Sequence, residues 1–302
     1  MLYPSAIFRM KARAALKGHW QAALLVALIV NLPTLLMQGF SAFTGNDLAN
    51  RLQSVVVAAS RDGVMSQSLL VKEINDVLNS TAFWTIRGLE LLALLITPCL
   101  ALGMYKWLMD LLRGEEHPVS FVFCRMKLFL RAIGLQLLII LKVLLWMLPG
   151  IAVMAVLMFP LFRAGNAQAQ LEALQRGYNL TLPVMLLMII PGAMAALRYA
   201  LSEYILAEEP GTKILECIRR SKELMKDQKK NLFFLVFSFL LWYILEILIA
   251  SLLSGVLSLV FQMFAGLALN VYMSCSVAAF FLHLAYGEKP VPGPEPASED
   301  LN

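Results

Sequence analysis

A long apolar stretch near one end of the chain limits the folds that the sequence can adopt. Residues 232–286 contain one charged side chain, Glu246. At 1.5 Å per residue, ~20 apolar residues cross a hydrocarbon core of ~30 Å, so this stretch can cross twice, with a turn near Ser254 and Gly255. Of the 302 residues, 60% are hydrophobic and 15% are charged, whereas soluble domains are about half apolar and about a quarter charged. The chain is therefore predicted to reside in a membrane.

Similar apolar runs recur along the rest of the chain. We predict an all-α, polytopic membrane protein with about six transmembrane helices in a single domain, residues 1–287. The polar residues 44–84 are expected to form an extracytoplasmic loop with short amphipathic helix, and the tail of residues 288–302, rich in Pro, Gly and acidic residues, to be disordered. The first apolar run follows a basic segment without a cleavage site and is expected to stay in the protein. The predicted spans are residues 20–43, 85–112, 131–150, 181–201, 232–254 and 262–286.

The third apolar run, residues 128–162, is too long for one straight span, since it would measure ~50 Å as a helix. The pair Pro149–Gly150 interrupts it. Either one span ends near Pro149, or two spans meet there. The second alternative leaves residues 151–162 only ~18 Å to cross the bilayer, which is too short. We predict one span, and leave open whether residues 151–162 cross the membrane or lie at the interface.

The distribution of Lys and Arg predicts the orientation, because cytoplasmic connections carry an excess of both. The segments before span one, after span two and after span four lie on one side of the membrane and hold fifteen of these residues. The connections on the opposite side hold six. Both termini are therefore predicted to be cytoplasmic. The net charge of +5 is explained by this bias, and we expect no nucleic-acid partner.

Two of the basic segments have the pattern of amphipathic helices. Ile214, Ile218, Ser221 and Met225 share one helical face, and most of the nearby Lys and Arg lie elsewhere. Such helices can lie on the anionic inner leaflet, or the charges can simply stop the chain at the membrane surface. The predicted lipid-surface residues are Arg9, Lys11, Arg13, Lys17, Lys213, Arg219, Arg220, Lys222, Lys226, Lys229 and Lys230.

The two basic segments also resemble each other. In both, a basic amphipathic stretch ends in Lys and runs directly into a span, with Leu16 aligned with Met225 and Lys17 with Lys226. This likeness suggests an internal duplication, which is common in transporters. The alternative is that every boundary between cytoplasm and lipid needs basic residues.

Three motifs carry a family resemblance. They are "KARAALKGHWQAAL", "LLMIIPGAMAALRYALSEYILAEEP" and "SKELMKDQKKNLFFLVFSFLLWYIL". They resemble an uncharacterised integral-membrane family of mainly Gram-positive bacteria, domain-of-unknown-function family nine hundred and seventy-five. The layout is also similar to that of the membrane domain of some glycerophosphodiester phosphodiesterases. The resemblance implies a six-helix, multi-pass protein of a bacterial cytoplasmic membrane and brings no established activity.

Charged and polar residues within spans are costly and mark candidate sites. Lys142 lies ~16 Å beyond Arg131 and Glu246 ~22 Å beyond Asn231, so the two can approach each other if the lysine extends. Glu90 is a second candidate partner for Lys142, and Asn270 is a lone polar group. The pair Lys142–Glu246 can bind a solute or ion, or can fix the register of two helices. Predicted helix kinks are Pro33, Pro149, Gly150, Pro191 and Gly192.

The chain lacks the spacings of common catalytic and metal motifs, and its four cysteines form no disulfide or metal-ligand pattern. We therefore predict no enzyme activity, no cofactor and no metal site. Two functions stay open. The first is a non-catalytic protein that organises the membrane, binding anionic lipids, a membrane-protein partner or a second copy of itself. The alternative is a small-solute or ion transporter or channel that uses Lys142 and Glu246.

Overall fold

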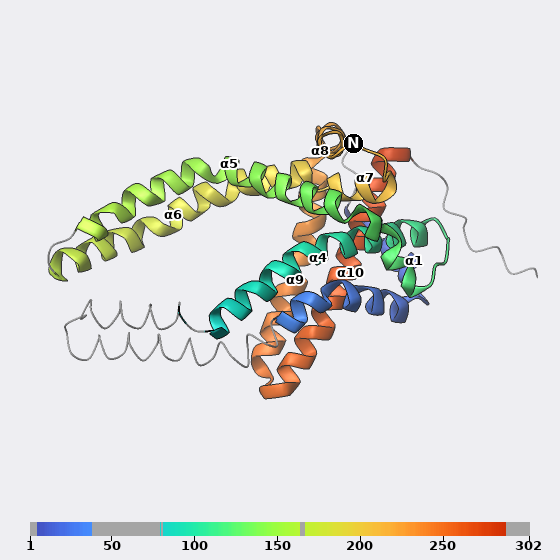
Figure 1. Ribbon diagram of the computed structural model, residues 1–302, viewed down its shortest axis with the longest axis horizontal. Coiled ribbons are helices and arrows are strands. Elements are labelled where there is room, and N and C mark those ends of the chain that lie inside the picture. Colours follow the sequence, from blue (N-terminus) through green and yellow to red (C-terminus); the bar gives the residue numbers. More distant parts are fainter. Residues whose placement is uncertain (1–4, 38–78, 80, 164–166, 288–302) are drawn as a thin grey trace, which may run out of the picture. The chain divides into compact units, whose positions relative to one another are not determined.

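The computed structural model describes residues 5–37, 79, 81–163 and 167–287, and this part contains helices and no strand (Figure 1). The all-α prediction is confirmed. Within the described residues, six helical stretches are long and apolar enough to cross a membrane, as predicted. These stretches are Trp20–Met37, Trp84–Leu112, Val119–Val156, Pro183–Glu208, Lys229–Leu252 and Leu257–Tyr286.

The chain divides into two compact units. Unit 1 comprises the described residues of Met1–Leu28, Ala101–Lys127 and Ala200–Asn302, and unit 2 those of Ile29–Leu100 and Leu128–Tyr199. The helix that contains Trp20–Met37 and the helix α4 belong in part to each. The elements are α1 (Ser5–Leu16), α4 (Thr81–Leu112), the 3-10 helix η1 (Val119–Leu128), α5 (Phe129–Arg163), α6 (Ala167–Tyr199), α7 (Ser202–Glu208), α8 (Ile214–Leu224), α9 (Lys229–Leu252) and α10 (Gly255–Tyr286).

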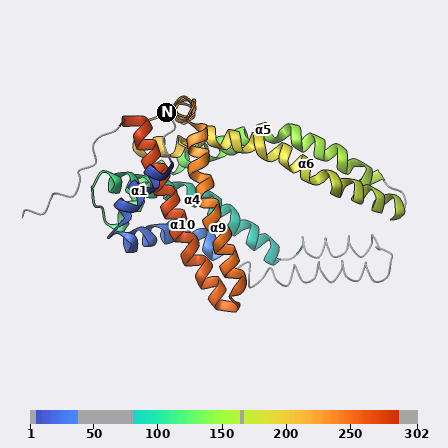
Figure 2. The ribbon, with the colours of Figure 1, turned by 180° about the vertical axis from the view of Figure 1, so that it is seen from behind.

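Unit 1 is organised around α10. The helices α9 and α10 lie side by side and are joined by a short turn (Figures 1 and 2). Gly255 begins α10 with a φ of 58°, a conformation that favours glycine, so the predicted turn is confirmed. Helix α1 packs on the other end of α10. The rings of Phe8 and Phe280 meet edge to face with centroids 5.2 Å apart, and the Tyr272 hydroxyl donates to the Arg9 carbonyl at 3.2 Å.

The short helix α7 connects α4 to α10 within unit 1. Its residues Ile205, Leu206 and Ala207 are fully buried. The Tyr204 ring stacks on that of Tyr105 in α4 with centroids 4.4 Å apart, and its hydroxyl donates to the Ser274 carbonyl of α10 at 3.1 Å. A turn at residues 200–201 separates α6 from α7, so α6 ends close to the predicted end of its span at residue 201.

Unit 2 contains a hairpin of two long helices, α5 and α6, which pack along each other (Figures 1 and 2). The two predicted Pro–Gly kinks lie inside these continuous helices. Both glycines are buried at the contact. A Cβ at Gly150 would lie 2.0 Å from Met188 Cγ, and one at Gly192 would lie 3.2 Å from Met147 Cγ. The glycines therefore permit close approach of the helices, while the bends at these pairs and at Pro33 stay predictions.

Several boundaries differ from those expected. Helix α4 begins at Thr81, so the last residues of the predicted loop are helical. Residues 151–162 continue α5 as helix, and α6 begins at Ala167, well before the predicted start of its span at residue 181. The proposed amphipathic helix between residues 44 and 78 and the tail of residues 288–302 lie outside the described residues. Cys99, Cys124, Cys217 and Cys275 are free thiols.

Candidate functional site

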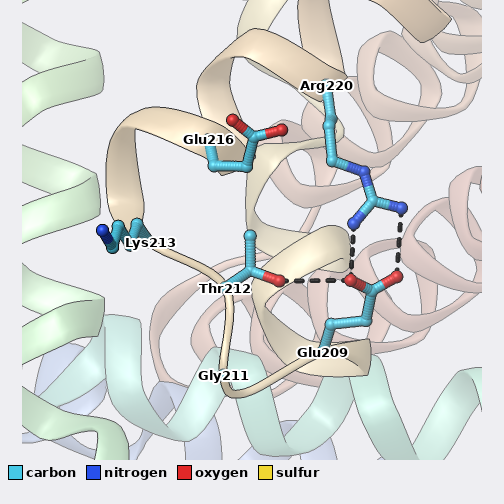
Figure 3. Close-up of a pocket in the computed structure, with 6 residues that line it drawn as sticks. All are labelled: Glu209, Gly211, Thr212, Lys213, Glu216 and Arg220. Atoms are coloured by element: carbon cyan, nitrogen blue, oxygen red, sulfur yellow. Dashed lines mark hydrogen bonds and ion pairs between the residues drawn. The ribbon is translucent and has the colours of Figure 1, made fainter.

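The corner between α7 and α8 carries a bidentate ion pair (Figure 3). Glu209 follows the last residue of α7, and Lys213 precedes α8 in an extended conformation. The Arg220 guanidinium donates to the two Glu209 carboxylate oxygens at 2.5 and 3.0 Å, and the Thr212 hydroxyl donates to the same carboxylate at 3.1 Å. The hydrogen bonds from Arg220 hold the pKa of Glu209 below its ordinary value. This pair fixes α8 against the end of α7.

Two cavities border this ion pair, and Glu209 and Arg220 line both. The first, of about 570 Å³, is an open polar hollow (Figure 3). The second, of about 300 Å³, has apolar walls from α8 and α10. The first cavity presents two cations and two carboxylates, so its charges favour no single sign of ligand. Its other lining residues are Gly211, Thr212, Lys213 and Glu216; those of the second are Glu223, Leu224, Phe281, Ala285 and Tyr286.

A second charged cluster joins the end of α4 to α7. Asp110 is only 2% exposed, and it accepts hydrogen bonds from Lys106 at 2.7 Å and Arg113 at 3.3 Å. Glu208 accepts from the same two cations, at 3.1 Å from Lys106 and 2.6 Å from Arg113. Buried charges need partners of this kind, because an unpaired one is expensive to desolvate. We call Lys106, Asp110, Arg113 and Glu208 the α4–α7 ion network.

Sequence reasoning missed this network. Lys106, Asp110 and Arg113 stand at positions i, i+4 and i+7 at the end of a predicted span, and this spacing places them on one helical face. The presence of Lys and Asp inside an apolar run could have marked these positions as a candidate charged cluster. Their partner Glu208 is distant in the sequence, so only the fold identifies it.

Asp110, Glu115 and His117 could hold a metal ion, because one ligand atom of each lies within 4.8 Å of the others. The Asp110 charge is already matched by Lys106 and Arg113. His117 Nε2 also lies 3.3 Å from the Asp110 carboxylate. Lys106 and Arg113 place two positive charges beside Asp110, and these charges would repel a metal ion bound to the same carboxylate. The cluster therefore fits an ion network better than a metal centre.

Most of the predicted lipid-surface residues lie on or next to α1 and α8, whose apolar faces are buried in unit 1, and Lys229 and Lys230 begin α9. In α8, Ile218, Ser221 and the following Met225 are buried. In α1, Phe8, Ala12 and Leu16 are buried. The basic side chains lie on the other faces. Those that are exposed are Arg13, Lys17, Lys213, Arg219, Lys222, Lys226 and Lys230, and Arg9, Lys11, Arg220 and Lys229 are half-buried.

Five lysines of this region, Lys213, Lys222, Lys226, Lys229 and Lys230, form no ion pair with a described residue. By contrast, Arg219 pairs with Glu216 at 2.8 Å, and Arg220 with Glu209. The arginines thus serve contacts inside α8 and with α7, and the lysines leave positive charge on the surface.

The predicted intramembrane residues are distributed over both units. Lys142 lies in α5 of unit 2 and Glu246 in α9 of unit 1, so their pairing stays a prediction. The Glu90 carboxylate lies 2.5 Å from Arg87 on the same helix, which supplies a local partner. Asn270 lies in α10. Glu246 and Asn270 therefore share one helical hairpin.

These features define a polytopic α-helical membrane protein with a basic surface and a charged cluster at the ends of its helices. Residues 1–287 match the family described as "Protein of unknown function (DUF975)", and the chain belongs to this family. This confirms the family resemblance of the three motifs. No curated protein and no solved structure matches the chain.

Proposed function

We propose that this protein is a non-catalytic component of the bacterial cytoplasmic membrane that holds a basic surface against anionic groups at the inner leaflet. The lysines of residues 213–230 and the cations of α1 form this surface. The observation that carries the proposal is the burial of the apolar faces of α1 and α8 inside unit 1. Because those faces are occupied, the two helices are fixed parts of the fold and present their charges to the outside.

The position of the lysines supports contact with lipid headgroups. Helix α8 ends at Leu224 and the apolar span α9 begins at Lys229, so the charges immediately precede a membrane entry. Each Lys or Arg near an anionic surface contributes ~1 kcal/mol, and the contribution falls off within a Debye length. Since the apolar face of α8 packs on protein, the expected mode is electrostatic contact rather than insertion of the helix into lipid.

Native mass spectrometry of the protein released from nanodiscs tests this proposal. In nanodiscs of mixed phosphatidylglycerol and phosphatidylcholine, the wild-type protein should retain phosphatidylglycerol preferentially. Reversing three unpaired lysines (Lys222→Glu, Lys226→Glu and Lys230→Glu) removes ~3 kcal/mol of attraction, which corresponds to a preference lower by on the order of 100-fold. Lys142→Met is the control and should leave the preference unchanged. Equal retention of both lipids by the wild type would refute the proposal.

The orientation can be tested with the native cysteines. Cys124 in η1 is exposed, whereas Cys217 in α8 is buried, and burial raises the pKa of Cys217 to about 11. A membrane-impermeant maleimide should label Cys124 in inverted vesicles and not in intact cells, and it should label Cys217 only after unfolding, because thiolates are the reactive species. Labelling of Cys124 from outside intact cells would contradict the predicted orientation and with it the lipid contact.

The second candidate is a small-solute or ion transporter or channel. The observation in its favour is Glu246, a carboxylate within a span that has no ion pair inside unit 1. This candidate predicts the opposite ranking of variants. Solute flux into proteoliposomes should then be lost in Lys142→Met and Glu246→Gln and should persist in the triple lysine reversal.

A further inference from the structure

Glu246 is the one acidic residue of the apolar helix α9. It lies in the interior of the span, and no Lys, Arg or His of unit 1 forms an ion pair with it. An uncompensated carboxylate at such a position costs several kcal/mol. A carboxylate that finds no cation can remove this cost by taking up a proton.

The neighbouring helix provides room for this side chain. A Cβ placed at Gly266 of α10 would lie 3.2 Å from Glu246 Oε1, so the carboxyl group occupies the space that a larger residue would fill. Asn270 follows Gly266 by one helical turn and therefore lies on the same face of α10. Its Oδ1 is buried and accepts no hydrogen bond from any described residue. The hairpin thus holds a carboxyl group and, one turn away, an acceptor that lacks a donor.

The surroundings of Glu246 carry little charge. On its own helix, Tyr243 is the nearest titratable residue, one turn earlier. Helix α10 contains no Asp, Glu, Lys or Arg, and its titratable groups Tyr272, Cys275, His283 and Tyr286 all follow Asn270. Residues 20–28, which contact α10 through Trp20 and Tyr272, contain no ionisable group. Helix α1 also packs on this hairpin, with Arg9, Lys11 and Arg13, and it meets α10 at Tyr272, Cys275 and Phe280.

We propose that Glu246 is a proton-binding site within the α9–α10 hairpin: it is a neutral carboxylic acid there, and its O–H supplies Asn270 Oδ1 with a donor, directly or through one water. The proton, and not Lys142, then neutralises the side chain. This site is independent of the basic surface of α1 and α8, and the proposed lipid contact can fail without affecting it.

Labelling with the apolar reagent dicyclohexylcarbodiimide tests the proposal on the full chain in liposomes. The carboxyl proton transfers to a carbodiimide nitrogen while the carboxylate oxygen bonds to the carbodiimide carbon, so only the protonated acid reacts. Mass spectrometry should find the adduct on Glu246. Glu90, a carboxylate of another span that is paired with Arg87, is the internal control and should stay unmodified. The adduct should be lost in Glu246→Gln.

Three outcomes would overturn the proposal. Protection of Glu246 by sodium ions at constant pH would make it a cation site. Labelling that appears only in Lys142→Met would show that the lysine neutralises the wild-type carboxylate. The third is an infrared difference spectrum between wild type and Glu246→Gln that lacks the carbonyl band of a protonated acid, a measurement that does not depend on access of the reagent. Asn270→Leu should keep this band but shift its frequency, since the hydrogen bond is lost.

Discussion

Both units are built from apolar helices, but different kinds of contact stabilise the interior of each. Unit 1 combines buried aromatic contacts with polar ones: Asp110 and Glu208 share two cations, and the Tyr204 hydroxyl binds the Ser274 carbonyl. In unit 2, the α5–α6 hairpin relies on close approach of helices at Gly150 and Gly192. In a bilayer the lipid is as apolar as the side chains, so close packing and polar contacts, rather than hydrophobic burial, distinguish one helix arrangement from another.

This difference has a consequence for tolerance to mutation. A polar network loses a large free energy when one member is removed, because the remaining charges stay buried without a partner. A contact between a glycine and a flexible methionine can adjust by a change of rotamer. We therefore expect unit 1 to be the more sensitive of the two, and the following variants test that expectation from the largest effect to the smallest.

The largest effect is expected for Asp110→Ala in unit 1. The substitution leaves Lys106 and Arg113 with Glu208 as their remaining carboxylate partner, and breaking a buried pair in this way typically costs ~3–5 kcal/mol. Thermal unfolding of the detergent-solubilised protein measures the loss. Glu223→Gln is the control, since Glu223 is 67% exposed and lies 3.9 Å from Arg219, and exposed pairs contribute only ~0–1 kcal/mol. Equal losses in the two variants would show that the network does not stabilise unit 1.

The next effect is expected for Gly103→Ala, also in unit 1. The new Cβ would lie 1.7 Å from the backbone carbonyl oxygen of Val122. Because backbone atoms must then move, the cost should be ~1–3 kcal/mol, the range for overpacking. Gly88→Ala is a matched control on the same helix, since nothing lies within 4 Å of its Cβ position. A similar change in melting temperature for both variants would count against the close contact between α4 and η1.

A smaller effect is expected for Gly150→Ala in unit 2. The new Cβ meets Met188 Cγ at 2.0 Å and Met188 Cβ and Cα at 3.1 and 3.2 Å. A change of rotamer moves the Cγ atom, since methionine has three rotatable bonds, and the other two contacts need only a small shift of the facing helix. Replacing Gly by Ala in a helix also gains ~1 kcal/mol of helix propensity. The net change in unfolding free energy should stay within about 1 kcal/mol. A loss larger than that of Gly103→Ala would reverse the proposed difference between the units.

The smallest effect concerns the pH dependence of the Glu209–Arg220 pair. Because the folded pKa of Glu209 is lowered, its contribution is present above the ordinary glutamate pKa of ~4.3 and is lost as the pH falls through the folded value. The contribution is modest, since the Glu209 side chain is 44% exposed and solvent screens the pair. Melting curves of wild type and Glu209→Gln should differ at neutral pH and converge in acid. A difference that persists in acid would exclude this ion pair as its cause.

Part of the fold and of the candidate site could be predicted from the sequence. The six long apolar helices and the turn at Gly255 follow from run length and from glycine chemistry, and both are present. Of the face predicted from its spacing, Ile218, Ser221 and Met225 are buried, and Ile214 is half-buried. What covers this face could not be predicted, because a periodic pattern is the same whether the partner is lipid or protein.

The sequence by itself determined that the chain is an all-helical membrane protein, since run length and composition leave few other ways to satisfy the backbone in lipid. Only the tertiary structure decided that Glu208 shares its cations with Asp110, that Gly150 and Gly192 lie at a helix contact, and that Glu246 lies against Gly266. The physical reason is that these partners are separated along the chain, and side-chain contacts between distant helices depend on register and rotation, which local patterns do not encode.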